Sequence, residues 1–525
     1  MPETSEQMAR NTGFFTLALV GQKVISFIYF TYLARTFGPV DIGRYVLALS
    51  LTTIFSVLID LGTSSVLTRE VAREPQSANN LIRPILGFKI VMSLVAAILV
   101  VGISRLLNYP VVVQELIMIA TIVMVVDSFI LSFYSTIRGY HTLFWESVGV
   151  ILFQFTIAVL GVATSFVTHD VRWFMLALAL SVVIHFIYAY WQIKFRYQVF
   201  LWPEFNLSKW RAVAKLAWPF ALAAVLLRVY GYVDTVLLSV LSSEEAVGFY
   251  SVAYKVTFAL QFIPTAFAAS LFPGFSAYFK NAKDGAPNLN VLHQSDDLKG
   301  RTPRTSGPSN HVTNEWSAWY RGKLTDSFAH SLVYLTAIAV PVSFGLAVLA
   351  PVVVAALYPR FTASVQPLQI LMLSLPLLFA TFPIGSLLAA CNRQTRNTGN
   401  IAIATAVSVV ANLLLIPKFG PVGAALASFL GTITLLIAGA LVVKQIITVD
   451  SKWLFYKLVK ILIAGLVMAV VTWLLVQQIH FILVIIISTP VYLFLVIKLG
   501  GVSWQELINF YHILKQKSLP LRDNN

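Results

Sequence analysis

Two basic residues lie deep inside long apolar segments of the chain. Lys23 lies midway along the apolar run near 13–34, and Arg228 lies in the second half of the run near 213–241. A charged side chain at the centre of a membrane helix costs about 2.5–3.5 kcal/mol on insertion scales, so each residue needs a partner, a water-filled cavity or a route to the surface. If both face a cavity, Arg can bind an anion through two parallel hydrogen bonds and Lys can act as a point charge.

Two acidic residues also lie within apolar runs, and their role is open between two interpretations. Asp127 and Asp234 could bind a coupling cation or a proton. They could equally form structural pairs that neutralise Arg228 and Lys23, because a buried charge is usually paired.

Three further charged residues lie nearer to the ends of their apolar runs. Lys255 is either a second contact for an anion or a residue whose ammonium group reaches the membrane surface. We expect Lys89 to reach the surface in this way. Asp60 is expected to have a scaffold role, either by pairing with Arg69 or by capping backbone N–H groups.

The motifs of several enzyme classes are absent from the sequence. There is no GxxxxGK[ST], HExxH or CxxC pattern, and the single cysteine, Cys391, cannot form an intramolecular disulfide. We therefore predict no catalytic residues, no metal site and no cofactor.

The composition indicates a membrane protein built almost entirely from helices. Of 525 residues, 58% are hydrophobic and 11% are charged, and the mean hydropathy is +0.80, whereas soluble domains carry roughly 25% charged residues. A soluble enzyme is excluded. Because one span takes about 20 apolar residues, the chain holds about fourteen spans. The apolar runs lie near 13–34, 43–66, 84–106, 111–136, 143–167, 173–193, 213–241, 247–279, 327–357, 365–390, 399–416, 421–443, 458–478 and 480–499.

The distribution of basic residues predicts the orientation. The net charge is +15, and most of the 37 Lys and Arg residues fall in loops on the side of the N-terminus if the spans alternate. The positive-inside rule then places both termini in the cytoplasm. The basic excess is thereby explained without a nucleic-acid partner.

Two segments lie outside the spans. The polar stretch at 280–326 is rich in Pro, Gly, Ser and Asn, which predicts a mobile cytoplasmic loop that links two halves. The stretch from Ser503 to Lys517 has apolar residues at helical spacing and basic residues at its end. This pattern predicts a short amphipathic helix on the inner membrane surface.

The chain contains a weak internal repeat. Residues 33–48 align with residues 238–253, so that Gly43 matches Gly248, and Lys23 matches Arg228 in the same register. Six spans separate the two copies, which gives them the same orientation in the membrane. The repeat predicts two pseudo-symmetric six-helix lobes around a central cavity, an architecture common in transporters.

Four motifs give the chain a resemblance to the polysaccharide biosynthesis, or oligosaccharide flippase, family of the multidrug/oligosaccharidyl-lipid/polysaccharide (MOP, MATE-like) exporter superfamily. They are ARTFGPVDIGRYVLAL from Ala34, DLGTSSVLTREVAR from Asp60, LLAACNRQ from Leu387 and NLLLIPKFGPVGAALAS from Asn412. The resemblance covers the chain to about residue 500 and implies two six-helix lobes, often followed by two further helices. It also implies that lipid-linked sugars move from the inner to the outer leaflet by alternating access.

From the repeat and the resemblance we expect a defined domain organisation. Residues 1–200 form the N-terminal lobe, 201–279 and 327–445 form the C-terminal lobe around the loop at 280–326, and 446–525 form two extra helices and the tail. Glycines and an amide in the motifs are expected to be scaffold residues because they permit turns and close helix packing. These residues are Gly43, Gly248, Asn412, Gly420 and Gly423.

The hypothesis that follows is a flippase in the inner membrane. The resemblance implies a polyprenyl-diphosphate-linked oligosaccharide as substrate, with its diphosphate on Lys23 and Arg228 and with Lys255 as a contact during release. Membrane lipids and other glycan-assembly proteins are the candidate partners. The alternatives are a cation-coupled multidrug antiporter of the same superfamily, a membrane glycan polymerase or ligase, and a scaffold for a glycan-assembly complex.

Overall fold

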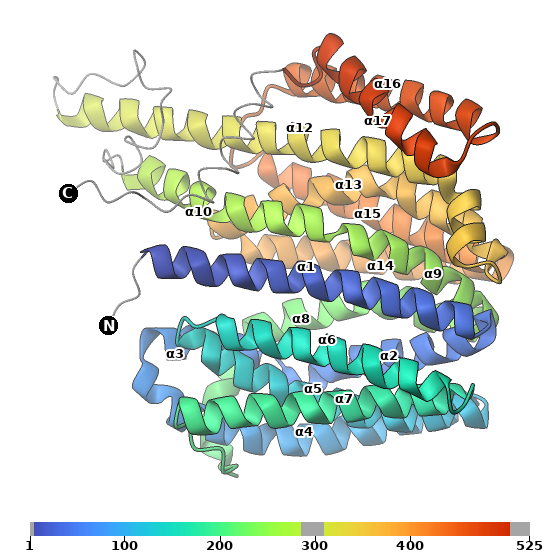
Figure 1. Cartoon of the computed structure of the whole chain (residues 1–525). Coiled ribbons are helices and arrows are strands. Elements are labelled where there is room, and N and C mark those ends of the chain that lie inside the picture. Colours follow the sequence, from blue (N-terminus) through green and yellow to red (C-terminus); the bar gives the residue numbers. More distant parts are fainter. Residues whose placement is uncertain (1–4, 285–308, 504–525) are drawn as a thin grey trace.

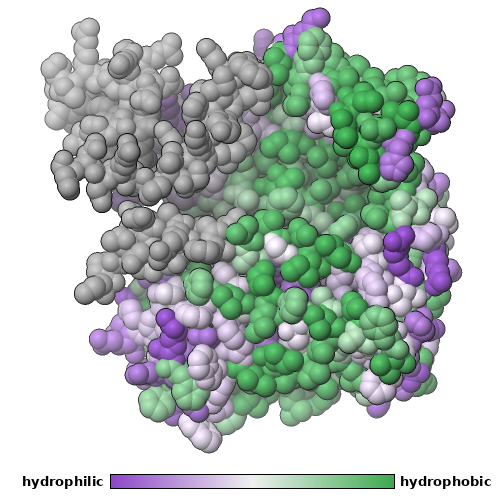
Figure 2. Space-filling view, in the orientation of Figure 1, coloured by the Kyte–Doolittle hydropathy of each residue, from purple (hydrophilic) through white to green (hydrophobic). Residues whose placement is uncertain are grey.

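Fourteen helices in the described part of the chain are long and apolar enough to cross a membrane. The computed structural model describes residues 5–284 and 309–503, and these ranges contain helices and turns but no strand. The helices lie side by side along one axis (Figure 1). On the face shown in Figure 2, hydrophobic residues cover the middle and hydrophilic residues gather toward the left and right ends. The predicted all-helical, multi-pass membrane architecture is confirmed.

The N-terminal lobe consists of one helical bundle. Helix α5 lies at its centre and packs against α2, α3, α4 and α7, while α1 and α7 pack on α6. The helices of this lobe are α1 (Ser5–Thr36), α2 (Pro39–Asp60), α3 (Thr63–Arg73), α4 (Ala78–Leu106), α5 (Val111–Gly139), α6 (Phe144–Ser165) and α7 (Val171–Trp191).

The C-terminal lobe is a second bundle, followed by two helices that pack on its outside. Helix α13 packs against α12 and α15, and α14 packs against α8 and α15. The two last helices contact the lobe through α12 (Figure 1). These elements are α8 (Leu207–Leu241), α9 (Glu244–Leu260), α10 (Phe262–Asp284), α12 (Ser309–Leu357), α13 (Val365–Ala390), α14 (Gln394–Phe419), α15 (Pro421–Val443), α16 (Ser451–Val476) and α17 (Phe481–Lys498).

The second predicted apolar run, 43–66, is not one continuous helix. Helix α2 ends at Asp60, and the next two residues have positive φ, 40° at Leu61 and 78° at Gly62. The chain turns here because α8 lies against it: a Cβ atom on Gly62 would lie 2.8 Å from the carbonyl oxygen of Ala217. Glycine allows both the left-handed conformation and the close approach.

The polar segment predicted as a loop over 280–326 is shorter than expected. Helix α10 continues to Asp284, and α12 already begins at Ser309. The two helices hold each other in this region, because the Ser317 hydroxyl donates to the carbonyl oxygen of Ala282 at 2.7 Å. The prediction of a loop is therefore wrong for both ends of the segment. Residues 285–308 and the predicted tail helix beyond Ser503 lie outside the described residues.

The two lobes meet closely where α2 crosses α9. A Cβ atom on Gly43 would collide with the main chain of Glu244, and one on Gly248 would collide with the main chain of Pro39. Arg44 Nε lies 2.5 Å from Glu244 Oε2 at the same crossing. The two glycines that match in the sequence repeat are therefore each in direct contact with the backbone of the opposite lobe. This crossing lies at the end of the bundle opposite the N-terminus (Figure 1).

We expect Gly248→Ala to destabilise the protein, because the added methyl group must push two backbones apart. Overpacking of this kind costs about 1–3 kcal/mol, so the thermal unfolding temperature in detergent should fall. Gly102→Ala is the matched control, since a Cβ atom on this helical glycine meets nothing within 4 Å. Equal unfolding temperatures for the two variants would contradict the close crossing.

Candidate functional site

Lys23 and Lys255 approach each other from different lobes. The Lys23 ammonium lies 3.7 Å from the centre of the Phe258 ring, and the Lys255 ammonium donates to the Ser26 hydroxyl at 3.1 Å. Each lysine therefore contacts a residue on the other helix, three positions from the other lysine. This pattern arises because α1 and α9 run antiparallel. Within the described ranges neither lysine has a carboxylate at ion-pair distance.

The electrostatic result is a pair of uncompensated positive charges at the lobe boundary. The two ammonium groups repel each other, and the only stabilising contacts described for them are rings and a hydroxyl. The Lys255 ammonium also lies 5.3 Å from the centre of the Phe30 ring. Both lysines are half-buried, and aromatic faces attract a cation by only about 0.5–2 kcal/mol. An anion between the two lysines would supply the missing compensation.

Arg228 and Asp127 form a second interlobe arrangement, of opposite charges. Both side chains are exposed in the protein, although each lies within a membrane-spanning helix, α8 and α5 respectively. They attract each other, yet among the described residues they are not within ion-pair distance. Their attraction therefore acts at longer range, between α8 of the C-terminal lobe and α5 of the N-terminal lobe. Lys23, by contrast, lies close to Lys255.

Asp234 is buried inside the C-terminal lobe and has no basic partner there. Its carboxylate accepts hydrogen bonds from the Tyr250 hydroxyl at 3.1 Å, the Ser408 hydroxyl at 3.3 Å and the Asn412 amide at 2.6 Å. The interpretation of Asp234 as a neutralising partner for the candidate basic residues is wrong, because within the described residues neutral donors surround it.

Asn412 completes this buried cluster and leaves one oxygen unused. Its side-chain nitrogen bonds to Asp234, but its buried Oδ1 has no hydrogen-bond partner among the described residues. A carboxylate and an amide oxygen are the ligand types that hard cations prefer. The sequence placed Asn412 among the scaffold residues and did not show its contact with Asp234.

Two glycines hold the next turn, between α14 and α15. Gly420 has a positive φ of 53°, and a Cβ atom on Gly423 would lie 2.6 Å from the carbonyl carbon of Leu415. The turn brings the start of α15 back against α14, the helix that carries Ser408 and Asn412.

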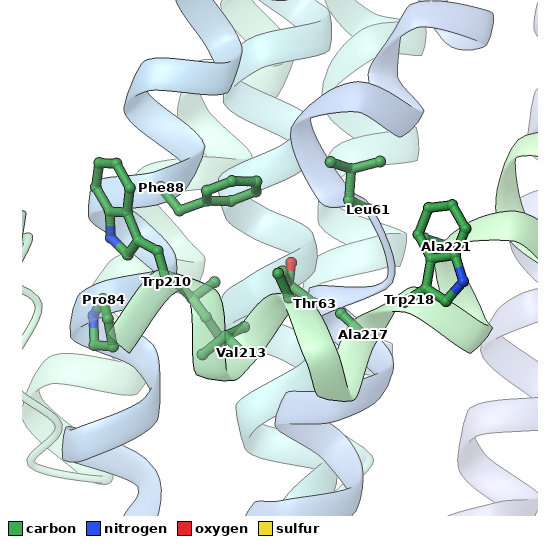
Figure 3. A pocket seen from close by; sticks show the side chains of 11 residues that line it. Leu61, Thr63, Pro84, Phe88, Trp210, Val213, Ala217, Trp218 and Ala221 are labelled. Atoms are coloured by element: carbon green, nitrogen blue, oxygen red, sulfur yellow. The ribbon is translucent and has the colours of Figure 1, made fainter. Parts of the chain in front are cut away.

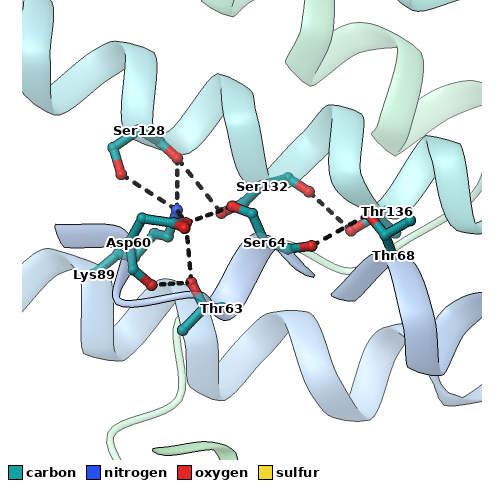
Figure 4. A network of polar contacts seen from close by, with 8 residues as sticks. All are labelled: Asp60, Thr63, Ser64, Thr68, Lys89, Ser128, Ser132 and Thr136. Carbon is teal, nitrogen blue, oxygen red and sulfur yellow. Dashed lines mark hydrogen bonds and ion pairs between the residues drawn. The ribbon is translucent and has the colours of Figure 1, made fainter. Parts of the chain in front are cut away.

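An ion pair with a fully buried lysine lies at the centre of a polar network in the N-terminal lobe (Figure 4). Lys89 is 0% exposed, and its ammonium donates to Asp60 Oδ1 at 2.9 Å and to the Ser128 carbonyl oxygen at 2.8 Å. Asp60 also accepts from the Thr63 and Ser64 hydroxyls at the start of α3. This network fastens α2 and α3 to α4 and α5 beside the turn at Gly62.

Two predictions are corrected by this network. Lys89 does not reach the membrane surface, because its ammonium group is satisfied inside the lobe. Asp60 does not pair with Arg69, whose Nε lies 2.7 Å from Glu70 instead. Asp60 nevertheless serves to hold helices together.

A small apolar cavity lies where the first half of α8 rests on the N-terminal lobe. It has a volume of about 100 Å³ and lies between Trp210 and Trp218 of α8, Leu61 and Thr63 at the α2–α3 turn, and Phe88 of α4 (Figure 3). No charged residue lines it. Its position shows that α8 contacts both lobes, because the second half of this helix packs on α14.

Comparisons with known proteins identify a family and a fold. The sequence profile of the family described as polysaccharide biosynthesis protein matches residues 8–279, more than half of the chain. No curated protein sequence matches the chain significantly.

Several solved structures of transporters share the fold at low sequence identity. The lipid II flippase MurJ in an inward closed conformation superimposes with a TM-score of 0.70 and 15% identity, covering 95% of this chain and 99% of its own. An inward-facing multidrug resistance MATE family transporter of the MOP superfamily gives 0.54 and 13%, with 85% and 95% covered. A MOP superfamily transporter from Pyrococcus furiosus gives 0.55 and 12%, with 85% and 98% covered. The chain therefore has the MOP transporter fold.

We expect Lys89→Met to destabilise the N-terminal lobe strongly. Removal of one partner of a buried ion pair typically costs about 3–5 kcal/mol, because it leaves the other charge uncompensated. The double variant Lys89→Met with Asp60→Asn should recover part of this loss. The measurement is thermal unfolding in detergent, with the exposed Arg73→Gln as the control. An unfolding temperature for Lys89→Met equal to that of the control would show that the pair does not hold the helices.

Proposed function

The chain belongs to the polysaccharide biosynthesis protein family, and on that premise we propose that it flips a polyprenyl-diphosphate-linked oligosaccharide from the inner to the outer leaflet. The observation that carries the proposal is the pair of lysines at the lobe boundary. Lys23 and Lys255 belong to different lobes and lack carboxylate partners within the described residues. A diphosphate has the charge and the acceptor oxygens to bridge them.

Arg228 has a distinct role in this proposal. Its guanidinium is exposed and is drawn toward Asp127 without direct contact. A diphosphate that enters between the lobes competes with Asp127 for Arg228, and the planar guanidinium can bind two phosphate oxygens at once. The substrate then contacts α1, α9 and α8, while its lipid tail stays in the bilayer.

The close crossing of α2 and α9 supports alternating access. Gly43 and Gly248 join the lobes at the end of the bundle opposite the N-terminus. We propose that this end is extracytoplasmic and that substrate enters from the end that carries the N-terminus, in an inner membrane with both termini in the cytoplasm. The membrane potential would assist outward movement of phosphate charge by about 2.3 kcal/mol per charge per 100 mV.

Asp234 is our candidate for ion coupling. Neutral donors alone surround this buried carboxylate in the described structure, and Asn412 Oδ1 beside it is unpartnered. A monovalent cation or a proton would neutralise the charge within the C-terminal lobe. Because Tyr250 on α9 donates to Asp234, occupancy of this cluster would act on the helix that carries Lys255.

The charge pattern favours an anionic substrate over a cationic drug. A multidrug antiporter needs acidic groups in its cavity, whereas the lysine pair at the lobe boundary would repel a cation. The one acidic residue that we place between the lobes, Asp127, is already attracted to Arg228. A transporter role with a lipid-linked substrate, rather than a polymerase or ligase, also agrees with the family. Association with other glycan-assembly proteins remains part of the proposal.

We expect Lys23→Gln combined with Lys255→Gln to lower flipping by at least about tenfold, because each lysine loses a charge-assisted hydrogen bond worth about 1.5–3 kcal/mol. The measurement is transfer of a fluorescent polyprenyl-diphosphate oligosaccharide across proteoliposomes of equal protein content. Arg360→Gln combined with Lys418→Gln, two exposed residues at or next to turns between helices, is the charge-matched control. An unchanged rate would exclude the lysine pair as the substrate site, and efflux of a cationic dye by the unaltered protein would favour the antiporter.

We expect Asp234→Asn to remove the dependence of flipping on Na⁺ or on pH, because the variant has no charge to be compensated. The amide is nearly the same size, so the hydrogen bonds from Tyr250 and Ser408 can be kept. Flipping is measured in vesicles over a series of Na⁺ concentrations and pH values, with Asp450→Asn at the exposed start of α16 as the control. An ion dependence identical to that of the unaltered protein would exclude Asp234 as the coupling site.

A further inference from the structure

The segment that joins the two lobes carries an unusual set of exposed aromatic side chains. Residues 192–206 connect α7 to α8, at the end of the bundle where the membrane span Val171–Arg196 stops. The aromatic residues in and beside it are between 57% and 78% exposed. They are Trp191, Phe195, Phe200, Trp202 and Phe205. Such side chains are stable in contact with lipid at the membrane interface rather than with bulk water.

The backbone of this connection is fixed, so the exposure does not come from a loose segment. The N–H of Phe200 donates to Asn79 Oδ1 at 2.7 Å, and the N–H of Glu204 donates to the carbonyl oxygen of Arg83 at 3.0 Å. A Cβ atom on Gly87 would collide with the main chain of Glu204. The connection therefore lies directly on α4 and holds its aromatic side chains outward.

A cavity of about 560 Å³ lies in the same place, and Lys194 is the charged residue in its wall. The Lys194 ammonium lies 5.3 Å from the centre of the Tyr190 ring and 5.5 Å from that of Phe195. Within the described residues it has no carboxylate at ion-pair distance. Trp202 and Pro203 form part of the same wall. The cavity thus combines one available cation with an aromatic rim, at a size typical of small-molecule sites.

We propose that this cavity binds an anionic phospholipid of the leaflet that surrounds it. Lys194 would hold the phosphodiester headgroup, and the exposed aromatic side chains would lie along the glycerol and the first part of the acyl chains. The exposed Arg196, Arg211 and Lys215 add positive charge at the same end of the bundle. Basic residues near the cytoplasmic surface each contribute about 1 kcal/mol to the attraction for anionic lipid. The aromatic rim distinguishes a lipid from a free phosphate, which would gain nothing from it.

The site bears on transport because it lies on the covalent connection between the lobes. The same connection continues into α8, whose first half rests on the N-terminal lobe through Trp210 and whose second half carries Arg228. A lipid that holds residues 194–203 at the membrane interface would also fix the depth at which α8 begins in the membrane. Anionic lipid should therefore favour one relative position of the lobes.

Native mass spectrometry of the purified full chain tests the binding site. We expect phosphatidylglycerol to give a retained one-lipid adduct, and phosphatidylethanolamine to give a much weaker one. Lys194→Gln should weaken the phosphatidylglycerol adduct roughly fivefold, the effect of one basic side chain near an anionic surface. Lys444→Gln, another exposed lysine at a helix end, should leave it unchanged. Equal retention of phosphatidylglycerol by Lys194→Gln and the control would overturn the proposal.

Fluorescence quenching adds a readout that does not depend on adduct counting. Brominated phosphatidylglycerol in the vesicles should quench part of the tryptophan emission, and brominated phosphatidylcholine should quench less of it. The difference between the two lipids should be lost in Trp202→Phe. Quenching that is the same for both lipids and unaffected by Trp202→Phe would overturn the proposal. Retention of a polyprenyl diphosphate in place of phosphatidylglycerol would also overturn the proposal, because the cavity would then be a substrate site. Lys23→Gln with Lys255→Gln should keep the phospholipid site intact, which separates this inference from the proposed function.

Discussion

The free-energy cost of placing a charge inside a membrane governs how this chain is organised. Lys89 meets that cost completely, because Asp60 and Ser128 surround its ammonium group. Asp234 meets it in part, through neutral donors alone. Lys23 and Lys255 meet it least, since rings and a hydroxyl are their described contacts. The degree of compensation separates the structural ion pair from the residues that we propose bind the substrate. A compensated charge stabilises a lobe, whereas an uncompensated charge would favour binding of an anion.

The same contrast follows the division into lobes. The Lys89–Asp60 pair and the Asp234 cluster each lie within one lobe, where their partners move together. The lysine pair and the Arg228–Asp127 pair each join residues of different lobes. The lobes also touch through Gly43 and Gly248, where backbone meets backbone without an intervening side chain. Polar contacts also join the lobes at this end: the Arg44–Glu244 ion pair, the Arg35 hydrogen bond to the carbonyl oxygen of Ala356, and the Thr31–Tyr358 hydrogen bond. The glycine contact itself depends on packing alone, so these polar contacts are the bonds that a separation of the lobes at this end would break.

Hydropathy and motif patterns were sufficient to predict the fold but not the pairing of charges. Apolar runs of span length identify the helices because a helix needs about 20 apolar residues to cross the hydrocarbon core of a membrane. The break at Leu61–Gly62 leaves no mark in the hydropathy of the run, since it depends on how closely α8 approaches. Lys89 and Asp60 are 29 positions apart on different helices, and nothing local to either residue indicates the contact. The interpretation of Asp234 as a neutralising partner failed for the same reason: its donors come from α9 and α14, and the sequence does not show which helices are neighbours.

The two interlobe pairs have opposite signs, and an anion would reverse the balance between them. Without a ligand, Lys23 on α1 and Lys255 on α9 repel each other, while Arg228 on α8 and Asp127 on α5 attract each other. A diphosphate bound at the lysines, as we propose, would turn their repulsion into attraction to a common partner, and it would weaken the attraction between Asp127 and Arg228 by competing for the guanidinium. Binding would thus strengthen one interlobe contact while it loosens another. A ligand shifts a conformational equilibrium only through such a difference in interaction between two states. The substrate's own charge would then supply the preference for moving the lobes.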